Sequence, residues 1–246
     1  MFLIKYITNK FTDTNNLNNE FTTGKPLPSI VFDDFLPKEF VTELYNESMS
    51  IPDEYWKIFT RKGSHMMETT NLNVAPIANE FVNQMHSHMG MKWLSSIVGI
   101  PELISDPYIV GAGYSKSFNG DTLQVHSDFN WNDTLKLHRA LSLIIYITPT
   151  WKPEYGGGLE FYDYNNKEII KTVDCNFNRC LIWQHHKRGF HGYKRPIESP
   201  NGLSRNAFKL FFYVSKAEYD PEDPPHRSLY WYDENSNQPY DNRDEI

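Results

Sequence analysis

The sequence of 246 residues contains few cysteines, no long apolar run and no excess of basic side chains. Two cysteines, Cys175 and Cys180, are too few for a disulfide-stabilised scaffold, so we expect two reduced, buried thiols. No segment approaches the roughly 18 apolar residues that a membrane-spanning helix needs. Residues 1–7 also lack the apolar region and cleavage site of a signal peptide. These absences predict a cytoplasmic protein that does not bind a membrane.

The net charge of −7 is confined to the end of the sequence. Residues 217–246 contain nine acidic and two basic side chains, whereas residues 1–216 contain both signs in equal number. Because the body is neutral and has no basic patch, nucleic acid is not an expected partner. The acidic extension also contains three adjacent aromatic residues at positions 230–232. We expect these rings to pack against the body, with the end of the chain loose.

The N-terminal part of the sequence predicts helices. Residues 1–25 are polar and rich in asparagine and threonine, which is typical of a loose arm. Apolar residues then recur at helical spacing over residues 40–49 and again over residues 77–98. Pro37 and Pro76 suit the first turns of these two helices. We therefore expect a helical support within residues 37–98.

The following part, residues 108–214, contains short β-rich runs separated by glycine, asparagine, aspartate and proline. Several runs are apolar on both faces, as in the interior of a sandwich or barrel. Helices followed by many strands predict a mainly β fold, α+β by content. It would be a double-stranded β-helix (jelly roll) with the N-terminal helices packed on one sheet. Residues 26–216 would form one domain. The strands are expected at 108–114, 122–128, 140–148, 159–162, 180–184 and 206–214.

His126 and Asp128 lie two residues apart in a predicted strand, so their side chains share one face. Such a pair is common by chance, and a hydrogen-bonded surface pair explains it equally well. His191, which precedes a glycine, would complete two imidazoles and one carboxylate, the facial triad that holds Fe(II). The same donors also suit Zn, Mn or Ni. His185 and His186 are alternative ligands, but they lie near the end of their strand and lack a following glycine.

Arg205 lies at the start of the last predicted strand, where alternation places it on one face with Lys209. A guanidinium group inside a sandwich needs an acidic partner or an acidic ligand. Its planar fork suits bidentate binding of a carboxylate. From the spacing alone, a salt bridge at the mouth of the barrel is the alternative interpretation. Lys209 is the alternative anchor.

The order of these features resembles the iron- and 2-oxoglutarate-dependent dioxygenases, in the branch similar to the prolyl 4-hydroxylases. The interval between His191 and Arg205 is longer than in many members, and we attribute the difference to an inserted turn at residues 196–202. The resemblance covers residues 114–214. The matching positions are Tyr114, His126-Ser127-Asp128, Arg139, Gly156-Gly157-Gly158, His191-Gly192 and Arg205.

The resemblance implies roles for individual residues. His126, Asp128 and His191 would bind Fe(II), and Arg205 would bind the distal carboxylate of 2-oxoglutarate. Tyr146, Tyr114 and Lys209 would make further contacts with the cosubstrate, and Arg139, Trp131 and Trp151 would contact the substrate. For the tyrosines and tryptophans, ordinary core packing is the alternative. For Arg139, an exposed salt bridge is the alternative.

The resemblance also implies a reaction. A hydroxylase of this kind converts 2-oxoglutarate and O2 to succinate and carbon dioxide while it hydroxylates a substrate, with ascorbate as a further reductant. The carboxylate of Asp128 favours hydroxylation over halogenation, because a small residue there would leave room for a halide. The expected substrate is a proline-containing peptide or protein. A free amino acid or small metabolite is one alternative, and a non-catalytic jelly-roll module that retains a metal is another. The oligomeric state is left open.

Overall fold

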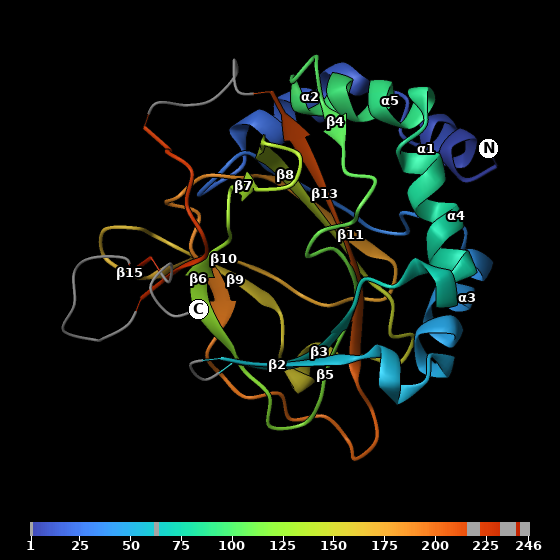
Figure 1. Ribbon diagram of the computed structural model, residues 1–246, viewed down its shortest axis with the longest axis vertical. Helices are drawn as coiled ribbons and strands as arrows, with labels where there is room; N and C mark the ends of the chain where they lie inside the picture. Colours follow the sequence, from blue (N-terminus) through green and yellow to red (C-terminus); the bar gives the residue numbers. More distant parts are fainter. Residues whose placement is uncertain (1, 62–63, 216–221, 232–239, 242–246) are drawn as a thin grey trace.

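Two antiparallel β-sheets face each other, and helices cover the outer face of the larger sheet (Figure 1). The computed structural model describes residues 2–61, 64–215, 222–231 and 240–241. One apolar core lies between the helices and the larger sheet, and a second lies between the two sheets. This is the predicted mainly β jelly roll with helices on one side. None of the helices in these described ranges has the length and apolar character needed to cross a bilayer.

Five α-helices precede most of the strands. The second region of helical periodicity forms two helices instead of one, because Ser87 caps the later helix by accepting a hydrogen bond from Gly90 N at 3.2 Å. A Cβ atom at Gly90 would lie 2.4 Å from the carbonyl oxygen of Met85, so only glycine allows this tight turn. The helices are α1 Phe2–Lys10, α2 Thr14–Thr23, α3 Lys38–Ser50, α4 Pro76–Met85 and α5 His88–Val98.

The larger sheet has nine strands in the described residues, and its main order is β1-β11-β8-β13-β5-β3-β2. The smaller sheet has the order β10-β9-β12-β6-β14-β15. The first seven strands are β1 Ser29–Phe32, β2 Lys57–Arg61, β3 Ser64–Thr69, β4 Ile104–Ser105, β5 Gly113–Ser117, β6 Leu123–Ser127 and β7 Trp131–Asn132. The remainder are β8 Leu137–Tyr146, β9 Leu159–Tyr162, β10 Ile169–Val173, β11 Arg179–Gln184, β12 His191–Tyr193, β13 Arg205–Val214, β14 Leu229–Tyr230 and β15 Tyr240–Asp241.

The prediction of a loose arm over residues 1–25 is wrong. These residues form α1 and α2, and the apolar side chains Leu3, Ile4 and Ile7 of α1 are buried. Asp13 caps α2 by accepting a hydrogen bond from Asn16 N at 3.0 Å. The polar composition concealed the few apolar residues, which lie on one helical face and pack into the core.

The strands also extend beyond the predicted jelly-roll region of residues 108–214. Strand β1 and the hairpin β2–β3 join the larger sheet from within the N-terminal part. The strand predicted at 108–114 begins later, at Gly113, because Ile109 and Gly111 have positive φ angles of 54° and 69°.

The acidic extension packs against the body through its aromatic rings, as expected for the residues that are described. Tyr230 lies against His126, and Trp231 stacks on Phe190 at a centroid distance of 4.4 Å. The third aromatic residue, Tyr232, lies outside the described residues, as do residues 242–246 at the end of the chain.

Candidate active site

His126, Asp128 and His191 come together between the sheets, with one potential ligand atom from each within 4.8 Å of the others. Strands β6 and β12 are antiparallel neighbours, and their register pairs His126 with His191. A Cβ atom at Gly192 would lie 2.6 Å from the carbonyl oxygen of Leu123, so the glycine after His191 lets the strands approach closely. The pairing of β6 with β12 therefore brings His191, the predicted third ligand, next to His126 and Asp128.

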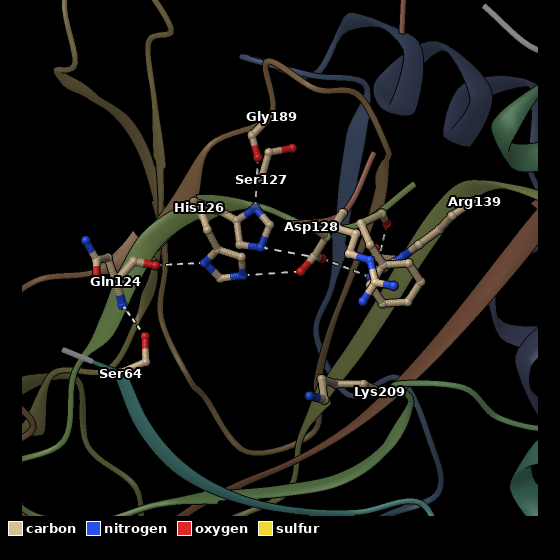
Figure 2. A network of polar contacts seen from close by, with 12 residues as sticks. Ser64, Gln124, His126, Ser127, Asp128, Arg139, Gly189 and Lys209 are labelled. Atoms are coloured by element: carbon tan, nitrogen blue, oxygen red, sulfur yellow. Dashed lines mark hydrogen bonds and ion pairs between the residues drawn. The ribbon is translucent and has the colours of Figure 1, made fainter. Parts of the chain in front are cut away.

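The two imidazoles present the same nitrogen, Nε2, to the carboxylate of Asp128. Figure 2 shows the imidazole of His126 facing Asp128. His126 Nε2 lies 3.2 Å from Oδ1 of Asp128, and His191 Nε2 lies 3.7 Å from Oδ2. Each Nδ1 faces a backbone carbonyl oxygen, that of Gln124 at 2.7 Å and that of Gly189 at 2.9 Å. This arrangement favours a proton on both Nδ1 atoms and leaves both Nε2 atoms free to bind a metal.

The charges at this cluster suit a divalent cation. Burial lowers the pKa of His191 to about 4, so its imidazole is neutral at pH 7. Burial opposes ionisation of Asp128, but the guanidinium of Arg139 beside it holds the pKa of this carboxyl well below its usual value. Two imidazoles and one carboxylate are the donor set of an Fe(II) facial triad.

Arg139 is buried beside the cluster and does not form the exposed salt bridge that the sequence allowed. Its Nη2 lies 2.9 Å from Oδ2 of Asp128 and donates a hydrogen bond to Ser142 Oγ at 2.8 Å. The guanidinium carbon lies 3.4 Å from the ring centroid of Phe211 and 4.8 Å from that of Phe129. Arg139 therefore fixes the carboxylate of Asp128, although it also lines the cavity described next.

A cavity of about 210 Å³ adjoins the three potential ligands. Arg205 and Lys209 line it from β13, as alternation along the strand predicted. Lys209 forms an ion pair with Glu68 of β3, so its charge is already balanced. Other lining side chains come from the β2–β3 hairpin and from the C-terminal extension, namely Phe59, Met66, Ser228 and Tyr230.

Arg205 lies buried at this cavity without an acidic partner. Its Nε lies 3.0 Å from Cys175 Sγ, and its guanidinium carbon lies 5.0 Å from the ring centroid of Tyr146. Within the described part of the chain, no carboxylate pairs with Arg205, and the buried hydroxyl of Tyr146 lacks a hydrogen-bond partner. A buried cation beside an unsatisfied phenol fits a ligand carboxylate.

The glycine-rich turn before β9 makes room for this arginine. A Cβ atom at Gly157 would lie 2.9 Å from Cδ of Arg205, and the residue has a φ angle of +73°. The surface of this turn, which carries no side chain, accommodates the arginine. Burial raises the pKa of Cys175, so the thiol beside Arg205 remains protonated.

The structure contradicts the predicted contact of Tyr114 with a cosubstrate. Its hydroxyl donates a hydrogen bond to Oε2 of Glu47 at 2.7 Å, and its ring packs against Phe208 on the helical side of the sheet. Ser115, the next residue of β5, lines the cavity in its place. The assignment of Tyr114 came from the resemblance alone, and in a strand neighbouring residues point to opposite faces.

The two tryptophans predicted to contact substrate do not line the cavity. Trp151 is buried between the sheets, and its Nε1 donates a hydrogen bond to the carbonyl oxygen of Gly156 at 3.1 Å. Trp131 is half-buried on β7 and lines a separate shallow pocket beside Phe129. Trp151 is thus a core residue, the alternative given above, and Trp131 lies next to the site.

The sequence interpretation missed the parts of the cavity that come from outside the central strands. Phe59 and Met66 belong to the β2–β3 hairpin, where apolar and polar residues occur close together and no strand was predicted. Tyr230 belongs to the aromatic group of the extension, which was predicted to pack on the body but not at the metal ligands. These residues are distant in sequence from the recognised motifs, and only the fold brings them together.

Comparison with known proteins agrees with this architecture. Residues 112–213 match the family model of the 2OG-Fe(II) oxygenase superfamily. No curated protein matches the chain by sequence.

Three similar solved structures are prolyl hydroxylases. The enzyme from Trichoplax adhaerens has a TM-score of 0.58 at 15% identity, covering 81% of this chain and 88% of its own. The prolyl 4-hydroxylase from Phytophthora capsici has a TM-score of 0.62 at 15% identity, and the match covers 91% of this chain and 69% of that enzyme. The enzyme from Pseudomonas putida has a TM-score of 0.57 at 12% identity, and the match covers 82% of this chain and 99% of that enzyme. The family match over residues 112–213 and this likeness show a chain that is similar to the 2-oxoglutarate- and Fe(II)-dependent oxygenases and has a prolyl hydroxylase-like fold.

Proposed function

We propose that this protein is a 2-oxoglutarate- and Fe(II)-dependent oxygenase that hydroxylates a prolyl residue in a peptide or protein. The observation that carries the proposal is the arrangement of one cavity. It has the cluster of His126, Asp128 and His191 on its wall, and the buried, acid-free guanidinium of Arg205 also lines it. A compound with a metal-chelating end and a carboxylate end, such as 2-oxoglutarate, matches both features.

The three clustered side chains would hold Fe(II), which supplies the activation of O2 when it is bound with 2-oxoglutarate. The chain contributes the orientation of these ligands. The carbonyl oxygens of Gln124 and Gly189 hold the two imidazoles, and Arg139 holds the carboxylate of Asp128. We expect this fixed orientation of the three side chains to limit the directions from which the cosubstrate and substrate can approach the metal.

Arg205 would bind the distal carboxylate of 2-oxoglutarate, and the free hydroxyl of Tyr146 would donate a hydrogen bond to it. Lys209, the alternative anchor, is less suitable because Glu68 already balances its charge. The surrounding rings and the thiol of Cys175 keep this end of the cavity largely free of water. Exclusion of water strengthens a charge-assisted hydrogen bond.

The prolyl substrate is supported by likeness. The Trichoplax relative was solved with a peptide fragment of a hypoxia inducible factor oxygen degradation domain. In this chain, the β2–β3 hairpin and the C-terminal extension line the cavity with Phe59, Met66 and Tyr230. Apolar and aromatic side chains on the cavity wall suit a pyrrolidine ring.

A free amino acid is the second candidate substrate. Glu68 and Lys209 place opposite charges inside the same cavity. This pair could exchange its partners for the ammonium and carboxylate groups of a small zwitterion. The same enzyme chemistry would then act on a metabolite instead of a peptide.

The test measures succinate from the purified protein with Fe(II), 2-oxoglutarate and O2, with and without ascorbate. The substrates are proline-rich peptides, matched peptides with alanine at each proline, and free amino acids. We expect succinate to increase only with the proline-containing peptides, and mass spectrometry to find one added oxygen per modified proline. Ascorbate should increase the number of turnovers.

Each alternative has its own outcome in this assay. Stimulation by an amino acid but by no peptide would favour the second candidate. Succinate formation without stimulation by any peptide or amino acid would contradict both substrates. Bound metal without succinate under every condition would overturn the proposal and favour a non-catalytic module. The His126→Ala variant, which lacks one metal ligand, provides the background level.

A further inference from the structure

The C-terminal segment, residues 222–231, forms part of the metal site. Strand β14 pairs with β6 on the side opposite β12, and the register places Tyr230 beside His126. The same residue of β6 pairs with His191 of β12. His191, His126 and Tyr230 therefore form one row across three strands, with the imidazole of His126 in the middle.

Tyr230 contacts one face of that imidazole. The two rings are nearly parallel, at an angle of 22° and a centroid distance of 5.5 Å, and Tyr230 also lines the cavity. The ring of His191 lies 4.7 Å away from His126 at an angle of 50°. The hydrogen bond from His126 Nδ1 to Gln124 restrains one edge of the ring. A flat neighbour on the ring face restrains the tilt of the ring plane.

The segment is held firmly at its beginning. Asn130, which is fully buried, donates hydrogen bonds from Nδ2 to the carbonyl oxygens of Asp223 and Pro224 at 3.2 and 3.0 Å. Its Oδ1 accepts a hydrogen bond from the backbone N–H of His226 at 2.7 Å. Asn130 follows Asp128 by two residues, so the segment is attached directly to the loop that carries the metal-binding carboxylate.

The next residue anchors the other face of β14. Trp231 stacks on Phe190 with an angle of 8° and packs edge-on against Tyr162. Phe190 immediately precedes His191 in the sequence. Tyr230 and Trp231 are thus neighbouring aromatic residues with different contacts, since only Tyr230 touches a potential metal ligand and the cavity.

We propose that Tyr230 is a positioning residue that holds the imidazole of His126 in the orientation required for metal binding. This inference rests on the proposed function, because it takes His126 as a metal ligand. The aromatic ring is the active part of Tyr230, and its hydroxyl group is dispensable for this role. The C-terminal segment is accordingly a structural part of the catalytic site.

The test uses the full chain and Co(II), an air-stable probe of the Fe(II) site. Calorimetry gives the affinity for Co(II), and the visible absorption of the bound ion reports its coordination. We expect Tyr230→Ala to weaken Co(II) binding by about three- to tenfold and to alter the absorption spectrum. Tyr230→Phe should retain wild-type affinity and spectrum. Trp231→Ala, the matched control, should lower the Tm but change the affinity less than about twofold.

The outcomes separate this inference from the proposed function. Equal loss of Co(II) affinity in Tyr230→Ala and Trp231→Ala would overturn the inference, because the effect would then arise from loosening of the strand. Unchanged affinity in Tyr230→Ala would also overturn it, while loss of binding in His126→Ala would still support the metal site. A wild-type protein that binds no Co(II) would overturn both. If Tyr230→Ala fails to fold, Tyr230→Leu replaces it with the same expectations.

Discussion

Replacement of Arg139 by methionine tests how strongly the fold depends on the ion pair with Asp128. Arg139 is 1% exposed, and its Nη2 lies 2.9 Å from Oδ2 of Asp128. Removing one partner of a buried ion pair costs roughly 3–5 kcal/mol. Because the side chain of Asp128 is 20% exposed, we expect the lower end, about 3 kcal/mol in the free energy of unfolding. In a domain of this size, the Tm should fall by about 6–12 °C.

The size of this effect should depend on pH. Despite the opposing effect of burial, Arg139 holds the pKa of Asp128 well below its value in an unfolded chain. A carboxyl group of this kind stabilises the folded state above the unfolded pKa, and the stabilisation is lost as the pH falls through the folded pKa. The difference between wild type and Arg139→Met should therefore be full at pH 7 and decrease below about pH 4.

Urea unfolding of the metal-free protein provides the measurement. The variants are Arg139→Met, Asp128→Asn and the double variant, which form a double-mutant cycle. We expect Arg139→Met to have a much smaller effect in the Asp128→Asn background, since no buried negative charge is left without a partner. An equal loss of stability in both backgrounds would refute the role of the ion pair. Retained pH dependence in the double variant would refute the linkage to Asp128.

Three further predictions concern the cosubstrate end of the cavity and its surroundings. Arg205→Ala should weaken 2-oxoglutarate binding to the Co(II)-loaded protein by about 10- to 100-fold in calorimetry, because a charge-assisted contact is lost; a similar loss in Lys209→Ala would show that the anchor is wrong. Tyr114→Phe should lower the free energy of unfolding by about 1–3 kcal/mol in urea, because it leaves buried Glu47 without this hydrogen bond, and should keep succinate formation unchanged; reduced turnover in the folded variant would contradict its placement outside the site. Gly157→Ala would press on Arg205 and strain a positive φ angle, so calorimetry should find weaker 2-oxoglutarate binding with unchanged Co(II) affinity; unaltered binding of both would contradict the close packing.

The cluster of potential metal ligands could be predicted from sequence because it depends on local regularities of strand geometry. Alternation along a strand places His126 and Asp128 on one face, and the glycine after His191 marks a close approach of two strands. The same alternation placed Arg205 and Lys209 at one cavity. These inferences need only the local geometry of a strand and the order of motifs along the chain.

The errors arose where a contact depends on distant parts of the chain. Tyr114 was placed at the cosubstrate by the resemblance alone, whereas β5 directs its side chain towards Glu47 of α3 and Phe208. The first two helices looked like a loose arm, since their few apolar residues are recognisable as a buried face only against α4 and α5. Tyr230 reaches His126 through strand pairing, which the composition of an acidic extension does not predict.

The pairing of β14 with β6 also protects the protein from unwanted association. Without β14, the strand that carries His126 would expose unpaired N–H and C=O groups along one side. Such an edge is a template for strands of other chains. The strand β15 pairs in turn with the other side of β14 and continues the sheet. The segment that completes the metal site therefore also keeps its central strand from acting as a site of aggregation.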